Sequence, residues 1–191
     1  MRDEYNISEL NPRKNPYANR LKKQITINLD GRTIDYFKSL ADAKGIPYDL
    51  TEHAPVFTIG EMMAEDLPHP EAVAKNLFVR DGSHRSYYLL SVQEEKRVDL
   101  KAFSKVHGTR RLSFASEEDL LSILGLTRGS VTPFGLLNDT VHQVFFYLDK
   151  DLAEGVIGIH PNDNTATVWL NASDLLELLA SFGCRYELAS F

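Results

Sequence analysis

The segment AKNLFVRDG (residues 74–82) has the alternating pattern of a β-strand, and its apolar run begins directly after a lysine. Leu77 and Val79 fall on one face of this predicted strand. A second apolar run, SYYLLSV (86–92), follows the turn residues DGSHR, so the two runs together predict a hairpin. Lys75 is either an ordinary solvated lysine at a strand end or a cation that holds an anionic or ester-bearing substrate.

The segments on both sides of the hairpin contain further strands and helices. Helical periodicity begins at Thr33 and stops at Gly45, and Ser116 can cap another helix whose first turn is acidic. The other predicted elements are strands at 24–29, 141–149, 156–160 and 165–170 and helices at 99–108 and 171–182. The sequence therefore predicts an α+β fold (mixed α/β), in which a mixed sheet of about six strands is flanked by four or five helices.

The composition is that of an ordinary globular protein without a disulfide framework. The chain has 191 residues, which is enough for one domain with a core of its own or one domain with an appendage. Its single cysteine, Cys184, excludes an internal disulfide and a multi-cysteine metal site, and its six histidines show no ligand spacing. Because neither a signal peptide nor a run of about 18 apolar residues is present, we expect a cytoplasmic protein that does not enter a membrane.

Charge is distributed unevenly along the chain. The whole protein has a net charge of −6, but residues 1–23 contain six Lys and Arg against three acidic residues. The remainder is therefore acidic, with 15 basic and 24 acidic residues, which argues against a protein that coats nucleic acid in general. A local basic patch can still bind phosphates, because phosphate contacts depend on local charge.

Common catalytic signatures are missing, and three weaker features remain. There is no GxGxxG, P-loop, HExxH or GxSxG motif, and no local signature of a Ser or Cys nucleophile. The first remaining feature is the pair Lys75–Asn76. The second is GSVTPFGLLND (129–139), in which glycines and a proline interrupt an apolar segment and can turn backbone N–H groups inward as an anion-binding nest. The third is HPNDNTAT (160–167), between two predicted strands.

In their order along the chain, these segments resemble the YbaK/ProX family of editing deacylases, which is related to the insertion domain of bacterial prolyl-tRNA synthetase. The resemblance extends from about Phe37 to the C-terminus. The segments that carry it are GIPYDLTEHAPVFTIGEM, AKNLFVRD, YYLLSV, KRVDLKAF, RRLSFASEEDLLSILGLTRGSVTPFGLLND and HPNDNTATVWLNASDLLELL. RLSFAS and GSVTPFGLLND are most similar to the free-standing branch that clears alanine from proline tRNA, and the cysteine-clearing branch is less similar.

The resemblance implies a fold, an activity and a set of site residues. It implies a YbaK-type editing domain over residues 33–191 that hydrolyses the aminoacyl ester of a mischarged tRNA, expected to be tRNA(Pro), without a metal or other cofactor. The predicted catalytic residues are Lys75, which matches the strand-end lysine of the family, Gly129, which opens its Gly-x-x-x-Pro loop, and His160, which matches its histidine before proline. The predicted substrate-binding residues are Asn76, Ser130, Val131, Thr132, Pro133 and Asn164.

These residue types suit the hydrolysis of an activated ester. Such a reaction needs a positioned water and stabilisation of a developing oxyanion more than it needs a strong nucleophile. The Lys75 ammonium can hold the terminal phosphate or ribose, and backbone N–H groups at 129–132 can hold the carbonyl oxygen. His160 either shapes the amino-acid pocket or transfers a proton, and the family implies that a ribose hydroxyl assists the water. A small pocket would admit alanine and exclude the larger proline.

The N-terminal segment allows several interpretations. Residues 11–48 resemble the start of a ribbon-helix-helix antitoxin, whose short strand enters the DNA major groove, and the basic RLKK (20–23) suits phosphate contact. However, the chain continues into DLTEHAPVFTIGEM instead of the second helix of that fold, so we do not expect DNA binding. We interpret residues 1–32 as a basic arm with a short strand. The arm is either disordered or pairs its strand with a second chain, in a homodimer, or with the sheet edge of its own domain.

Two alternatives to the clearance of alanine remain open from the sequence. One is an enzyme of the same fold that removes another amino acid, such as cysteine from Cys-tRNA(Pro). The other is a DNA-binding or regulatory protein without enzymatic activity that uses the N-terminal ribbon-helix-like segment. Incubation with several mischarged tRNAs separates the three readings, because only the first two predict the release of an amino acid.

Overall fold

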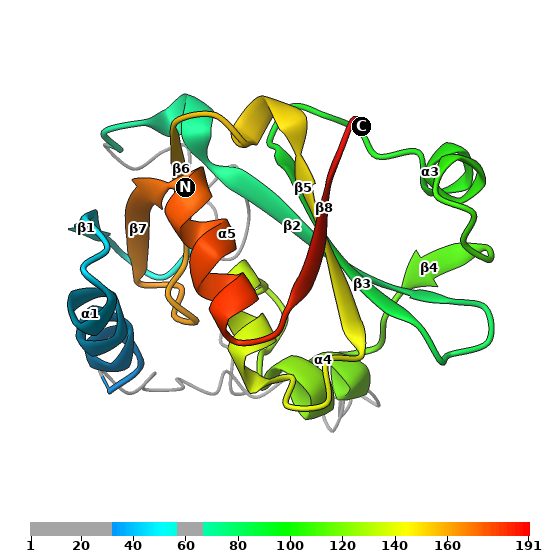
Figure 1. The fold of residues 1–191 in the computed structure, drawn as a ribbon, viewed down its shortest axis with the longest axis horizontal. Helices are drawn as coiled ribbons and strands as arrows, with labels where there is room; N and C mark the ends of the chain where they lie inside the picture. Colours follow the sequence, from blue (N-terminus) through cyan, green and yellow to red (C-terminus); the bar gives the residue numbers. More distant parts are fainter. Residues whose placement is uncertain (1–31, 57–66) are drawn as a thin grey trace, which may run out of the picture.

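The predicted hairpin forms the centre of the larger of two sheets (Figure 1). The computed structural model describes residues 32–56 and 67–191. Strand β2 (Ala74–Asp81) pairs antiparallel with β3 (Tyr87–Gln93). The buried carboxylate of Asp81 accepts hydrogen bonds from N–H groups of the turn between these strands, which fixes where the chain reverses.

Three further strands complete a five-stranded sheet with the order β4-β2-β3-β5-β8. β4 (Leu112–Phe114) is antiparallel to β2 and pairs only with the last three residues of β2, 79–81. β5 (Val144–Asp149) and β8 (Arg185–Ala189) extend the other side of the sheet in parallel pairings. Among the described residues, the first half of β2 therefore has no strand paired along one of its edges.

A smaller antiparallel sheet lies beside the beginning of β2. Its order is β1-β7-β6, formed by β1 (Tyr48–Glu52), β7 (Ala166–Asn171) and β6 (Val156–Ile159). An isolated bridge joins Val73 to Gly158, which brings the residue before β2 next to β6. The two sheets thus meet at the open edge of β2.

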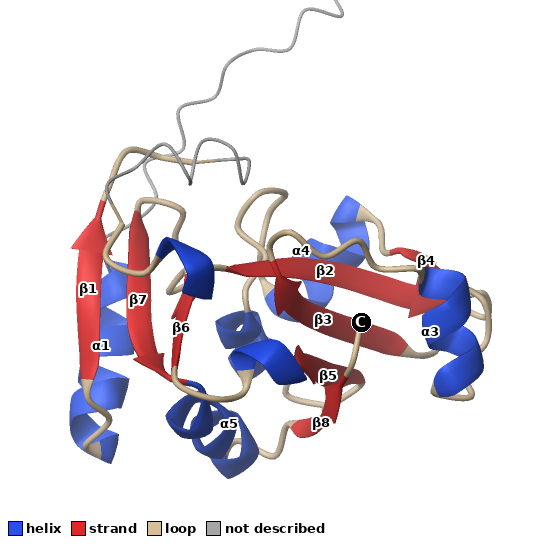
Figure 2. Cartoon of the chain, turned by 90° about the horizontal axis from the view of Figure 1, so that it is seen from above, coloured by secondary structure: helices blue, strands red, loops and turns tan. Residues whose placement is uncertain are grey.

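The helices cover both faces of the larger sheet (Figure 2). α1 (Arg32–Lys44), α4 (Glu117–Leu124) and α5 (Ala172–Ser181) contribute to the main hydrophobic core, whereas α3 (Leu100–Val106) contributes to a second one. α1 and α3 lie at opposite ends of the molecule in both views. The 3-10 helices are Pro70–Ala72, Pro133–Asn138 and Lys150–Leu152. None of the described helices has the length and apolar character needed to span a membrane.

Alternation along β2 assigns its side chains to two different cores. Phe78 belongs to the main core with α4 and α5, while Val79 packs in the second core with Phe103 of α3. Because side chains of a strand point alternately to the two faces, Lys75 lies on the same face as Val79, and Asn76 lies on the same face as Phe78. The two residues singled out at the start of the strand therefore project from opposite faces of the sheet.

The α+β fold predicted from the sequence is confirmed, with differences in detail. The helices expected at 33–45, 99–108 and 171–182 are present, and so is the helix capped by Ser116. The strands are divided between two sheets, β1, β4 and β8 were not predicted as strands, and a 3-10 helix occupies part of the loop expected at 129–140. The predicted strand at 24–29 and the homodimer contact assigned to it lie outside the described residues, and the division into an arm (1–32) and a domain (33–191) stays a prediction.

Candidate active site

A cleft of about 410 Å³ opens along the unpaired edge of β2. Its walls come from β2, from the segment that leads into α4, from the bend at 128–131 and from the residue that follows β6. Its size and mostly apolar lining are typical of a small-molecule site. Its polar and charged lining residues are Lys75, Asn76, Ser116, Glu117, Arg128 and His160. Of the nine site residues predicted from the sequence, five line this cleft: Lys75, Asn76, Gly129, Val131 and His160.

The Lys75 ammonium is held by the loop between β3 and α3. Its Nζ donates to the backbone oxygen of Glu94 at 2.8 Å and also to that of Lys96. Lys96 is itself fixed, because its Nζ lies 2.7 Å from the buried carboxylate of Asp149 and 2.7 Å from that of Asp151. An ammonium has three N–H donors, and two of those of Lys75 are taken up by described residues, which leaves a third that a ligand can use.

Asn76 is oriented from the opposite face of β2. The fully buried Ser91 donates its hydroxyl proton to Asn76 Oδ1, at 2.5 Å. The Nδ2 of Asn76 makes only a long contact of 3.4 Å with the backbone oxygen of Ala74. Because the oxygen end of the amide is occupied, the NH₂ end is the one that can donate to a ligand in the cleft.

The bend at 127–131 presents free backbone N–H groups. Gly129 has a φ of 90°, a conformation that L-residues rarely adopt. Ser130 closes the turn, because its N–H donates to the oxygen of Thr127 at 3.1 Å and its hydroxyl donates to the same oxygen at 2.9 Å. The N–H groups of Gly129 and Val131 donate to no other described residue. With respect to the described residues, the bend therefore has the unpaired donors that the predicted anion-binding nest requires.

His160 has a fixed tautomer and a lowered pKa. Its Nδ1 lies 2.8 Å from the carbonyl oxygen of Ala166, which can only accept, so Nδ1 carries the proton and Nε2 of the neutral ring can accept. Burial lowers the pKa of His160, and the nearby ring of His53, 5.8 Å away between centroids, lowers it further. Nowhere in the described parts of the chain do three His, Cys, Asp or Glu side chains converge as a metal site.

We expect the ring of His160 to titrate below its ordinary pKa of about 6.5. The pKa of His160 is therefore lower in the folded protein than in the unfolded chain, where the ordinary value of about 6.5 applies. Between these two values the unfolded chain binds more protons than the folded protein, so the contribution of the neutral His160 ring to stability is complete above pH 6.5 and declines as the pH falls below it. NMR titration of the ring measures the pKa, and urea unfolding of the wild type and His160→Gln at several pH values measures the stability. A midpoint at or above 6.5 would contradict the expectation.

The other four predicted residues lie behind the wall of the cleft. Ser130 closes the turn described above, Thr132 donates its hydroxyl proton to the backbone oxygen of His160 at 2.6 Å, and Pro133 begins a buried 3-10 helix. Asn164 is buried and donates from Nδ2 to the oxygen of Val56, a lining residue, at 3.1 Å. Thr132 and Asn164 thus contact backbone oxygens of two lining residues, His160 and Val56, and the role of these four residues in substrate binding stays a prediction.

Several lining residues were not predicted from the sequence. Phe114 of β4 lines the cleft with 63% of its surface exposed, and Glu117 and Arg128 form an exposed ion pair of 3.5 Å at the cleft. An aromatic residue in an apolar run ordinarily indicates a core position, so no pattern in the sequence marked Phe114. The positions of the two charged residues depend on how α4 packs, which local sequence does not reveal.

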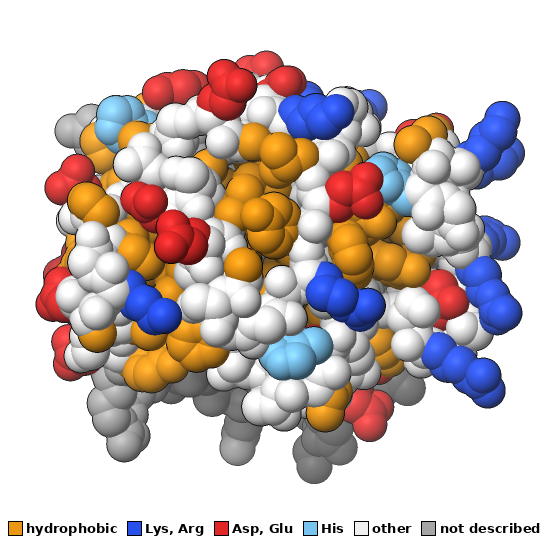
Figure 3. Space-filling view, viewed as in Figure 1, with side chains coloured by type: hydrophobic (Ala, Val, Ile, Leu, Met, Phe, Trp, Pro, Cys, Tyr) orange, Lys and Arg blue, Asp and Glu red, His pale blue; other side chains and the backbone are white. Residues whose placement is uncertain are grey.

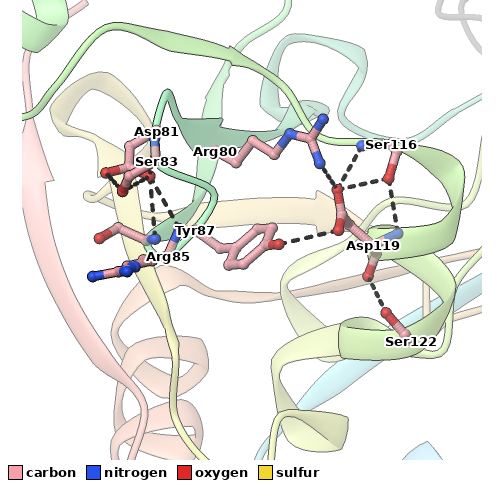
Figure 4. Close-up of polar contacts among 9 residues, drawn as sticks. Arg80, Asp81, Ser83, Arg85, Tyr87, Ser116, Asp119 and Ser122 are labelled. Carbon is pink, nitrogen blue, oxygen red and sulfur yellow. Dashed lines mark hydrogen bonds and ion pairs between the residues drawn. The ribbon is translucent and has the colours of Figure 1, made fainter.

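A network around Asp119 fixes the wall that enters α4 (Figure 4). The Asp119 carboxylate accepts hydrogen bonds from Arg80 Nη1 at 2.5 Å, Tyr87 Oη at 3.0 Å and Ser116 Oγ at 2.6 Å. Ser116 also accepts from the N–H of Asp119, which completes a capping box. Since Ser116 and Glu117 line the cleft, these contacts position that wall against β2 and β3.

Comparison with known proteins assigns the family. The profile of the aminoacyl-tRNA editing domain matches residues 53–178, a range that contains the whole lining of the cleft. The chain belongs to the aminoacyl-tRNA editing domain family. Proteins of this family are hydrolases, so the resemblance seen in the sequence and the prediction of an enzyme are both confirmed.

Similar proteins of this editing family are found in bacteria and animals. The chain is 42% identical over 147 residues to the prolyl-tRNA editing protein ProX of Acetoanaerobium sticklandii, which covers 76% of this chain and 90% of that protein. It is 37% identical over 131 residues to prolyl-tRNA synthetase associated domain-containing protein 1 of Danio rerio, covering 67% of this chain and 71% of the relative.

A solved structure supports the fold. The structure of a proposed trans-editing enzyme for prolyl-tRNA synthetase superposes with a TM-score of 0.64 and covers 83% of this chain and 95% of its own. The two sequences are 20% identical, so this likeness concerns the fold alone. The structural likeness covers 83% of the chain, which is more than the range 53–178 that the family model matches, so the shared fold extends beyond that range.

Proposed function

We propose that the protein hydrolyses, in trans, the ester bond of mischarged tRNA(Pro), with Ala-tRNA(Pro) as its substrate. The observation that carries the proposal is the convergence of Lys75, Asn76, the 129–131 bend and His160 on one cleft of an editing domain. The names of the two relatives refer to prolyl-tRNA editing and prolyl-tRNA synthetase, which supports tRNA(Pro) as the carrier. The RLSFAS and GSVTPFGLLND segments support alanine as the amino acid.

The geometry of the cleft accommodates the acylated end of a tRNA at the open edge of β2. The backbone oxygen of Phe78 accepts from Ala115 across that edge. Because backbone groups two residues apart in a strand point the same way, the N–H and C=O of Asn76 also point toward the edge. The Asn76 carbonyl and the Nε2 of His160 are acceptors suited to the α-ammonium group of an aminoacyl ester. The remaining donor of Lys75 suits the terminal phosphate or ribose.

The proposed reaction is the addition of water to the acyl carbon. The attacking water forms the new C–O bond, and the carbonyl oxygen becomes an oxyanion that the N–H groups of Gly129 and Val131 stabilise. The bond from the acyl carbon to the ribose oxygen then breaks, and a proton from the water reaches that oxygen. The products are free alanine and a tRNA with a free terminal hydroxyl. Ser116 does not act as a nucleophile in this scheme, because its hydroxyl is bound to Asp119.

The size of the cleft bears on how the amino acid is selected. At about 410 Å³ it is far larger than a methyl group, so it takes the terminal nucleoside and the amino acid together. Selection of alanine over proline is therefore a property of the part of the cleft that faces the side chain. A pocket that is too small for the proline ring excludes proline sterically. This exclusion is stronger than the rejection of a smaller amino acid by a larger pocket, where the missing methylene is worth only about 1–3 kcal/mol.

Incubation with a panel of tRNA(Pro) charged with alanine, cysteine or proline tests the proposal. We expect release of alanine well above the uncatalysed rate, and no release of proline. Preferential release of cysteine would show that Cys-tRNA(Pro), and not Ala-tRNA(Pro), is the substrate of the same hydrolytic reaction. Failure to deacylate any aminoacyl-tRNA, with protein shown to be folded by circular dichroism, would overturn the proposal.

A further inference from the structure

A second, larger groove of about 870 Å³ lies between α3 and β4. Three cationic side chains line it: Lys101 and Lys105, one turn apart on α3, and Arg111, directly before β4. Figure 3 shows Lys and Arg side chains gathered along the side of the molecule where Figure 1 draws α3 and β4. The single acidic lining residue is Asp99, whose carboxylate is turned into the helix to cap Lys101 and Ala102.

The cations of this groove have no acidic partner in the part of the chain that the structure describes. Lys101, Lys105 and Arg111 form no ion pair with any described residue. Two neighbouring cations differ, since Arg80 is paired with Asp119 and Lys96 with Asp149 and Asp151. The groove therefore offers positive charge that no described acidic side chain neutralises.

The segment that forms the groove is basic in an acidic protein. Residues 97–112 contain five Lys and Arg and one Asp, a balance of +4, whereas the whole chain has a net charge of −6. Such a concentration of one sign attracts polyanions even when the net charge of the protein repels them. The expected ligand is an extended array of phosphates rather than a single small anion, because the cations are spread over a helix and a strand.

The groove and one wall of the cleft lie on the same face of the larger sheet. Leu112 lines the groove and Phe114 lines the cleft, and residues two apart on β4 point to the same face, about 7 Å apart. This is the face of β2 that carries Val79, which is paired with Phe114, and Lys75. Phe114 thus offers an exposed aromatic surface between the groove and the cleft, suited to stacking of an unpaired base.

We propose that the α3–β4 groove binds phosphates of the tRNA acceptor arm while its single-stranded end passes Phe114 into the cleft. This inference rests on the proposed function, because the cleft defines where the acylated end must lie. An RNA duplex is recognised mainly through its shape and its phosphates. Flexible lysines suit this kind of recognition, because they can contact phosphates without reading base edges. The groove would then supply affinity for tRNA, and the cleft would supply the chemistry.

Charge reversal on α3 tests the proposal with a matched control on α1. Lys101→Glu/Lys105→Glu is compared with Lys38→Glu/Lys44→Glu, which changes the net charge equally at the other end of the molecule. Binding of uncharged tRNA(Pro) is measured by fluorescence anisotropy over a range of salt concentrations. We expect the α3 variant to bind about tenfold or more weakly, with a salt slope reduced by about two, and the α1 variant to bind within about twofold of wild type.

Equal weakening in both variants, or none in the α3 variant, would overturn the groove proposal. Arg111→Gln provides a milder variant in case the double change disturbs α3, and it should reduce the salt slope by about one. A second readout uses the 3′-alanyl ester of adenosine, which has no phosphate for the groove to bind. If wild type deacylates neither this ester nor Ala-tRNA(Pro), the proposed function fails, whereas the binding of uncharged tRNA still decides the groove proposal.

Discussion

Lys75→Ala is expected to lower kcat/KM for Ala-tRNA(Pro) by about 100- to 1,000-fold without unfolding the protein. The ammonium is the cation that β2 brings to the cleft, and loss of one charge-assisted contact in a shielded site typically costs this much. The measurement is the release of labelled alanine under single-turnover conditions. A folded variant with an unchanged rate would show that Lys75 is not part of the site.

Two further substitutions separate the charge of Lys75 from its structural contacts. Its Nζ also holds the loop at 94–96, so part of any effect of alanine is structural. Lys75→Met keeps the aliphatic stem without the charge, and Lys75→Arg keeps the charge with a different geometry. We expect the Met variant to be as inactive as the Ala variant, and we expect the Arg variant to recover only part of the activity. Full activity in the Met variant would exclude an electrostatic role.

Asp119→Ala is expected to destabilise the protein by about 3 kcal/mol, since it removes the carboxylate half of the capping box and leaves two partly buried partners unpaired. The change removes the hydrogen bonds that the Asp119 carboxylate accepts from the N–H and hydroxyl of Ser116, from Arg80 and from Tyr87 (Figure 4). For a chain of this size the midpoint of thermal unfolding should fall by about 6–12 °C. Differential scanning calorimetry or urea unfolding measures the change.

The matched control for Asp119 is Asp174→Ala. Asp174 occupies the same third position in the first turn of α5, but the helix cap there makes no side-chain hydrogen bond. We expect a loss of stability below about 0.5 kcal/mol from this substitution. A similar loss in the two variants would mean that Asp119 acts only through the helix dipole and not through the network at the cleft wall.

The strands and helices were predicted wherever a segment carried its own signal. The β2–β3 hairpin has alternating apolar residues, and α4 has the capping residue Ser116 followed by acidic residues. β4 and β8 lack such a signal, because β4 has three residues and β8 (RYELA) is mostly exposed. Their extended conformation comes from pairing with β2 and β5, so it is a consequence of tertiary structure.

The candidate site, like the fold, has features that the sequence predicted and features that depend on tertiary structure. Lys75 and Asn76 were singled out as a pair, yet their approach to the cleft from opposite faces follows from the open edge of β2, which only the strand pairing defines. Ser130 and Asn164 have side chains that donate to nearby backbone oxygens, and they do not line the cleft, although other residues of the same segments do. The resemblance between segments therefore pointed to residues around one cleft, but it did not separate lining residues from those behind them.

The central claim is that the cleft at the edge of β2 holds the acylated end of the tRNA, and a crystal structure with a stable analogue tests it most directly. In 3′-(L-alanylamino)-3′-deoxyadenosine an amide replaces the ester, so the ligand resists hydrolysis. We predict that its carbonyl oxygen lies about 3 Å from the N–H groups of Gly129 and Val131, with Lys75 beside the ribose. An analogue bound elsewhere, or with its carbonyl turned away from the bend, would contradict the claim.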